Sequence, residues 1–128
     1  MKKRTTFETA LVRRVAKKAD FLRYASYEMG LEQLRRKRME RMSECRWTVR
    51  FSPLSSSGAE VERGPSSISD YALVRRQFHI FERALRKFKS DVGLWVQYIE
   101  LAKREGARAL VGRITARFAF VCKLLYNS

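Results

Sequence analysis

The residues best suited to chemistry in this sequence are basic side chains that cluster in two places. Guanidinium and ammonium groups bind phosphates and carboxylates through charge-assisted hydrogen bonds. The chain carries 28 Lys and Arg residues against 13 Asp and Glu residues, a formal net charge of +15. This excess predicts binding to nucleic acid or to acidic protein surfaces. The candidate contact residues are Arg35, Arg36, Lys37, Arg38 and Arg41, followed by Arg75 and Arg76.

Three interpretations of the run at residues 35–38 remain open. It is a solvated helix face, a nuclear-import patch, or a contact with RNA or protein. If the basic residues share one ridge, they can neutralise phosphates, and the affinity for RNA then falls steeply with salt.

The sequence contains no recognisable motif for catalysis or for binding a cofactor. His79 is the single histidine, and no serine lies in a nucleophile-elbow motif. Cys45 and Cys122 are far apart, so their spacing matches neither a zinc site nor a disulfide framework, and it indicates a reducing compartment. The sequence therefore predicts a non-enzymatic protein without cofactor, metal or small-molecule substrate. The apolar run at residues 118–121 is too short to cross a membrane, so no membrane association is expected.

The elements that must position the basic residues are helices, because apolar residues recur at intervals of three and four. We expect helices over residues 6–19, 21–42, 71–88, 92–104 and 107–125, and therefore an all-α fold. Capping signals lie at Thr5 with Glu8, at Asp20, at residues 67–70 and at Ser90 with Asp91. Gly106 is placed to end the fourth helix.

The segment at residues 43–69 differs from the rest of the chain. It holds both prolines, Pro53 and Pro65, together with many serines, and its apolar residues show no period. This composition predicts a disordered insert. We expect three parts: residues 1–42 with an N-terminal helix and the first repeat helix, the insert at 43–69, and the remaining repeat helices at 70–128.

An internal repeat links the expected helices. Residues 80–84 resemble residues 114–118, an offset of 114 − 80 = 34, which is the length of a helix–turn–helix repeat. Residues 21–24 resemble residues 95–98, an offset of 95 − 21 = 74, so an insertion of about 40 residues separates the first repeat's helices. The fold class predicted is a short α-solenoid of tandem helix pairs. The expected repeat-core residues are Phe21, Tyr24, Phe78, Phe81, Trp95, Tyr98 and Ile114.

These residues carry a resemblance to known proteins. An aromatic-x-x-Tyr helix followed by the Ile-Phe-Glu-Arg-Ala-Leu of residues 80–85 resembles the half-a-TPR (HAT) repeat, which is TPR-like. Residues 20–29, 34–38 and 88–99 together resemble the N-terminal domain of the U3 small nucleolar RNA-associated protein family, sixth member. The resemblance covers about residues 6–42 and 68–117 of this chain.

The resemblance implies a nucleolar scaffold of the small-subunit processome, which supports rRNA processing and ribosome biogenesis. The implied partners are WD40-propeller proteins, with U3 small nucleolar RNA and pre-rRNA bound directly or indirectly. One alternative is a basic helical module that binds RNA. A second is a truncated, non-functional product of the same family, because residues 43–65 and 118–128 depart from the family pattern as retained introns would.

Overall fold

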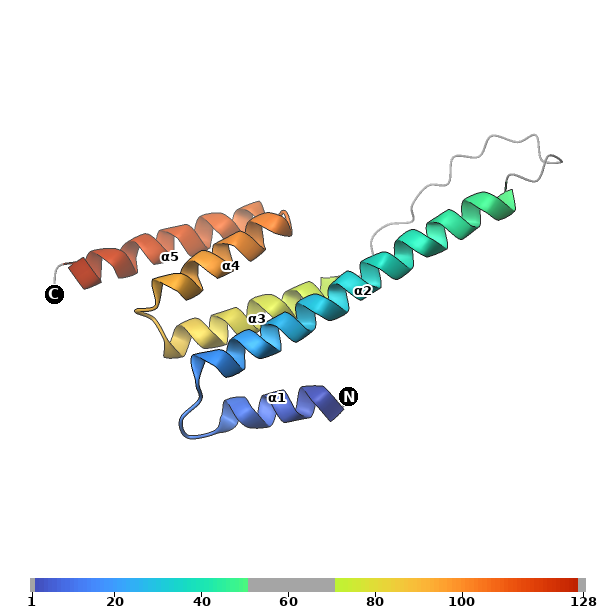
Figure 1. Ribbon diagram of the computed structural model, residues 1–128. Helices are drawn as coiled ribbons and strands as arrows, with labels where there is room; N and C mark the ends of the chain where they lie inside the picture. Colours follow the sequence, from blue (N-terminus) through green and yellow to red (C-terminus); the bar gives the residue numbers. More distant parts are fainter. Residues whose placement is uncertain (1, 51–70, 127–128) are drawn as a thin grey trace.

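The computed structural model describes residues 2–50 and 71–126, which form five α-helices and, within these ranges, no strand. In Figure 1 each helix turns back beside the one before it, and α2 with α3 lies between α1 on one side and the α4–α5 pair on the other. The predicted all-helical fold is confirmed. Among the helices described, none is both long and apolar enough to span a membrane.

The later helices agree closely with the predicted boundaries, whereas the first two differ. The observed elements are α1 Lys2–Val12, α2 Lys18–Arg50, α3 Ala72–Lys87, α4 Val92–Arg104 and α5 Arg108–Tyr126. The fourth helix has the expected bounds, and the third and fifth are within one residue of them. The predicted capping box of Thr5 and Glu8 is wrong, because α1 begins earlier and the Thr5 carbonyl accepts the Thr9 hydroxyl inside the helix.

The start of α2 corrects a second capping prediction. The helix begins at Lys18, so Asp20 lies in its first turn and is not the N-cap. Its carboxylate instead reaches back to accept the Lys17 backbone N–H at 3.4 Å. This is the return half of a capping box, in which an acidic residue at the third helical position satisfies a free donor ahead of the helix.

The end of α2 changes the expected extent of the insert. The helix continues to Arg50, although sequence composition placed its end at residue 42. Residues 43–50 contain neither glycine nor proline, and Pro53 is the first residue that would interrupt a helix. The helix α2 therefore includes the first eight residues of the predicted insert, 43–50. The rest of the insert, residues 51–69, and the capping signal at residues 67–70 lie outside the described residues.

Both ends of α4 are closed as the sequence predicts. The Asp91 carboxylate accepts the Leu94 backbone N–H at 3.2 Å, so Asp91 is the N-cap. Gly106 has φ = 69°, the left-handed conformation that favours glycine. The Gly106 N–H donates to the Lys103 carbonyl and the Ala107 N–H to the Ala102 carbonyl, both at 3.0 Å. These two bonds form a Schellman motif, which turns the chain directly into α5.

The core runs through all five helices. Apolar side chains from α1 to α5 are almost fully buried, and burial of such groups is the main favourable contribution to folding. Buried members of this core include Leu11, Phe21, Tyr24, Ile80, Phe81, Leu85, Leu94, Trp95, Tyr98, Leu101 and Ile114.

Candidate interaction surface and the repeated helix junctions

The first junction joins α1, α2 and α3 through Glu8, Tyr24 and Arg83. An Arg83 guanidinium N–H donates to the Glu8 carboxylate at 2.8 Å. Burial raises the pKa of Tyr24, and the neighbouring Glu8 carboxylate raises it further. Burial also acts to raise the pKa of Glu8, but the hydrogen bonds from Arg83 and Tyr24 outweigh it and the pKa is lowered. The Phe7 ring stacks on Tyr24 with centroids 5.3 Å apart and planes 10° apart.

The second junction joins α3, α4 and α5 in the same way through Glu82, Tyr98 and Arg117. The Tyr98 hydroxyl donates to the Glu82 carboxylate at 3.4 Å, and the Arg117 guanidinium lies 3.8 Å from that same oxygen. Burial raises the pKa of Tyr98 strongly, and the Glu82 carboxylate adds to the effect. Phe81 stacks on Tyr98 with centroids 5.6 Å apart and planes 8° apart.

The two junctions use equivalent sequence positions. The glutamates are separated by 82 − 8 = 74 residues and the tyrosines by 98 − 24 = 74, while the arginines are separated by 117 − 83 = 34. Sequence analysis missed this role for α1, although the signal is present. Residues 7–11 read Phe-Glu-Thr-Ala-Leu and residues 81–85 read Phe-Glu-Arg-Ala-Leu. α1 therefore occupies, against α2, the place that α3 occupies against α4.

The two junctions are filled differently behind these shared contacts. In the first, the Arg4 guanidinium makes two hydrogen bonds, 2.7 and 2.9 Å long, to the Glu28 carboxylate, whose side chain is 0% exposed. Gln77 is also buried there and donates to the Glu28 backbone carbonyl at 3.3 Å. The positions 74 residues after Arg4 and Glu28 are Phe78 and Ala102, so the second junction is apolar at the same place.

Two ion pairs, one at each end of α4, join that helix to α2. Lys18 pairs with Asp91 at the start of both helices. Arg36 pairs with Glu105 at the C-terminal end of α4 and with Glu32 on α2. These ion pairs show that α2 and α4 run in the same direction.

The structure divides the predicted basic contact residues into separate groups. Arg35 and Arg36 both donate to the buried Glu32 carboxylate at 2.9 Å, and their hydrogen bonds lower the pKa of that carboxyl although burial opposes them. Both guanidinium groups are thus paired within the molecule, although Arg36 is 48% exposed. Lys37, Arg38 and Arg41 are exposed further along α2. The last two predicted contact residues, Arg75 and Arg76, are exposed on α3, and Arg76 acts electrostatically on Glu8 in the first junction.

The predicted repeat-core residues all belong to the buried core or pack against it. Six are buried, from 0% to 3% exposed, and these are Phe21, Tyr24, Phe81, Trp95, Tyr98 and Ile114. Phe78 is half-buried and meets the Tyr98 ring edge-on at 6.0 Å. The Trp95 indole N–H donates to the Lys89 carbonyl at 2.9 Å, so the tryptophan also closes the α3–α4 turn.

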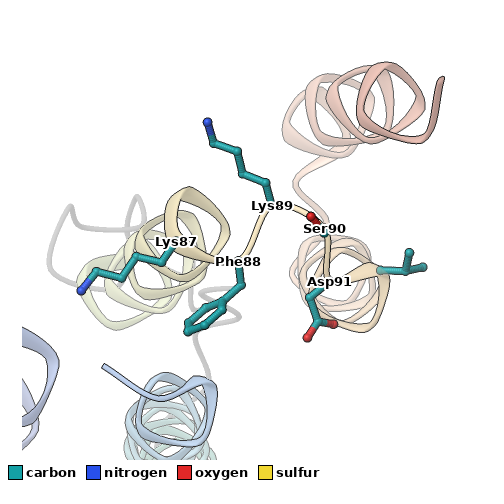
Figure 2. A pocket seen from close by; sticks show the side chains of 6 residues that line it. Lys87, Phe88, Lys89, Ser90 and Asp91 are labelled. Atoms are coloured by element: carbon teal, nitrogen blue, oxygen red, sulfur yellow. The ribbon is translucent and has the colours of Figure 1, made fainter. Parts of the chain in front are cut away.

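The α3–α4 turn also carries a shallow open hollow, lined by residues 87–92. Figure 2 shows the side chains of Lys87, Lys89 and Asp91 pointing away from one another. The Asp91 carboxylate already accepts from Leu94 and pairs with Lys18. The hollow therefore presents no set of polar groups directed at one ligand, and the described residues contain no cluster of metal-binding side chains elsewhere.

Comparison with known proteins places this chain in a family. The sequence model described as U3 small nucleolar RNA-associated protein 6 matches residues 1–76. The U3 small nucleolar RNA-associated protein 6 of Schizosaccharomyces pombe is 39% identical over 114 residues, which cover 89% of this chain and 20% of the relative. The mouse homolog is 31% identical and the human homolog 27% identical, each over 89% of this chain and 16% of the relative. The chain thus spans 20% of the length of the fission-yeast relative and 16% of the length of the mouse and human relatives.

Proposed function

We propose that this chain, which belongs to the U3 small nucleolar RNA-associated protein 6 family, is a helical-repeat scaffold of nucleolar rRNA processing and ribosome biogenesis. In this proposal its helices are HAT-type repeats of a short α-solenoid, and its work is to hold processome proteins together without catalysis. The partners are other processome subunits, including WD40-propeller proteins, and U3 small nucleolar RNA with pre-rRNA, directly or through those proteins. The site of action is the nucleolus within the nucleus.

The observation that carries the proposal is the pair of equivalent junctions within a chain of this family. Each junction combines Glu, Tyr and Arg from three successive helices, so the same contact is used twice to add a helix pair. Stacked helix pairs present long surfaces to partners, which is the usual role of such repeats. The open hollow at the α3–α4 turn offers no comparable support for a small-molecule site.

Affinity purification from the nucleolar fraction of a cell tests the scaffold. We expect the tagged chain to recover U3 small nucleolar RNA and processome subunits. A Tyr98→Ala chain, in which the second junction is lost, is expected to recover less, because Tyr98 is 0% exposed and contacts both Phe81 and Glu82. A Val96→Ser chain changes an exposed residue on the same helix and serves as the control. Recovery of neither RNA nor subunits by the folded parent chain contradicts the proposal.

Direct RNA binding is a second candidate, favoured by the exposed basic residues Lys37, Arg38, Arg41 and Arg75. Filter binding of the purified chain to a pre-rRNA fragment at low and high salt tests it. An affinity that falls steeply with salt, and falls again in a K37E/R38E/R41E chain, supports direct binding. An affinity that is absent at low salt contradicts it and leaves the protein contacts of the scaffold.

A further inference from the structure

The second half of α2 extends beyond the helix that packs against its first half. α2 has 33 residues and α3 has 16, so at about 1.5 Å per residue their lengths are roughly 50 and 24 Å. Figure 1 shows α2 continuing well past the start of α3. The ion pair of Arg36 with Glu105 marks where α4 ends beside α2. The residues that follow, up to Met42, are all exposed.

Two methionines lie along this projecting segment, on the side of α2 that is buried elsewhere. Tyr24, Glu28 and Glu32 are buried at intervals of four residues. Continuing from them by three, four and three residues gives Arg35 and then Met39 and Met42, so these side chains follow the same side of the helix. Met39 is 55% exposed and Met42 is 67% exposed. Met39 and Met42 therefore form an exposed apolar pair that continues this side of α2 beyond its charged members Glu28, Glu32 and Arg35.

Three cations and one carboxylate share this segment with the two methionines. Arg38 and Arg41 each precede a methionine, and Lys37 lies on the side away from the methionines. Glu40 lies between Met39 and Arg41, so the segment has a net charge of 3 − 1 = +2. All three cations are exposed. A second copy of the same surface would bring like charges together, which disfavours self-association through this face. RNA would engage the cations but would leave both methionine side chains in water.

We propose that residues Lys37–Met42 of α2 dock an acidic amphipathic helix from a partner protein. Flexible methionine side chains adapt well to an apolar helix face, and anchors spaced by three and four residues are how a helix is recognised. Glutamate or aspartate beside the anchors of the partner would meet Arg38 and Arg41, which sets orientation and accelerates association. The inference rests on the proposed scaffold function and names the class of partner that this segment takes.

Binding of a synthetic acidic amphipathic helix to the purified full chain tests the proposal. The probe is a peptide with leucine at heptad positions a and d and glutamate at e and g, followed by fluorescence anisotropy. M39S/M42S is expected to weaken its binding about tenfold or more, because the apolar contact of two methionines is removed. R38E/R41E is expected to weaken it as well and to remove most of its salt dependence. V12S/V15S is the matched control, since Val12 and Val15 are 77% and 78% exposed elsewhere, and its affinity should equal that of the parent.

Three results overturn the proposal: no binding of the peptide to the parent chain, equal binding by M39S/M42S, or complete displacement of the peptide by an RNA oligonucleotide. The test is independent of the cellular one. A chain that binds the peptide as described but recovers no processome component keeps the docking surface and loses the proposed function. A chain that recovers those components but ignores the peptide loses only the docking surface.

Discussion

The two junctions share the same three types of contact residue but differ in the side chains packed behind them. Both place a Glu, a Tyr and an Arg from three successive helices in contact. Behind them the first junction buries the Glu28 carboxylate, which pairs with the partly exposed Arg4, whereas the second has Phe78 and Ala102 at the equivalent positions. A buried ion pair loses hydration that its attraction only partly recovers, so an apolar filling of similar volume is often as stable or more so. The comparison shows that the shared triad sets the arrangement of helices, while the filling behind it can vary.

The difference also bears on how firmly α1 is held. Arg4 and Glu28 must keep a definite geometry, since a displaced Arg4 leaves a carboxylate that is 0% exposed without its partner. The apolar contacts of the second junction tolerate small shifts more easily, because dispersion and hydrophobic contacts are not directional. The first junction therefore specifies the position of its helix, and the second contributes stability with fewer geometric demands.

The largest effect on stability is expected when the buried carboxylate of the first junction is introduced at the equivalent position of the second. Ala102 is 0% exposed, so A102E buries a carboxylate without an arginine beside it. We expect the free energy of unfolding to fall by about 4 kcal/mol, the scale of an unpaired buried charge. Chemical denaturation followed by circular dichroism measures the change. The double variant F78R/A102E should recover part of the loss; a double variant no better than A102E would show that the junctions are not equivalent.

The reverse exchange has a smaller expected effect. R4F leaves Glu28 buried without its ion-pair partner and should cost about 3 kcal/mol. R4F/E28A gives the first junction the residues of the second and should return stability to within about 1 kcal/mol of the parent. The same denaturation measurement, analysed as a double-mutant cycle, gives the coupling between the two positions. A double variant as unstable as R4F would mean that the ion pair itself, and not the orphaned charge, dominates.

The helical fold could be predicted from sequence because its signals are local. The interval of three and four residues in α3 and the Asp91 and Gly106 signals around α4 each act within one or two turns. The boundaries of α1 and α2 could not be placed as well. Thr5 and Asp20 both read as caps, but whether a residue caps a helix depends on where the neighbouring turns stop.

The candidate site was less accessible to sequence analysis because its contacts join distant residues. The sequence around Arg35 and Arg36 does not indicate that Glu105 lies beside α2, so both arginines were predicted to contact a partner. The Arg4–Glu28 pair likewise joins two helices and has no local signature. The triads could have been found, because residues 7–11 and 81–85 are nearly the same sequence, but that comparison requires treating α1 as part of the repeat.

The ion pairs of the two triads provide a finer comparison. The Arg83–Glu8 distance is 2.8 Å and the Arg117–Glu82 distance is 3.8 Å, with Arg83 27% and Arg117 53% exposed. R83M should therefore cost more than R117M, although each is expected to cost about 1 kcal/mol or less because partly exposed pairs are screened. Thermal melts of both variants at low and high salt measure the difference. A larger loss in R117M would indicate that the cation–π contact of Arg117 with Trp95, at 5.7 Å, outweighs its ion pair.

The smallest effect concerns acid. The folded-state pKa of Glu8 is lowered from its model-compound value of 4.5, as is that of Glu32, whose largest cause is the hydrogen bond from Arg35. A carboxyl with a depressed pKa contributes stability above its unfolded pKa and loses it as the pH falls through its folded value. The melting temperature should therefore fall when the pH is lowered below about 4.5. In E8Q and in E32Q the melting temperature should fall less than in the parent between about pH 6 and about pH 3. If E8Q has the same pH dependence as the parent, the first triad does not retain its charge in solution, and only the stacked Phe7 and Tyr24 rings hold that contact.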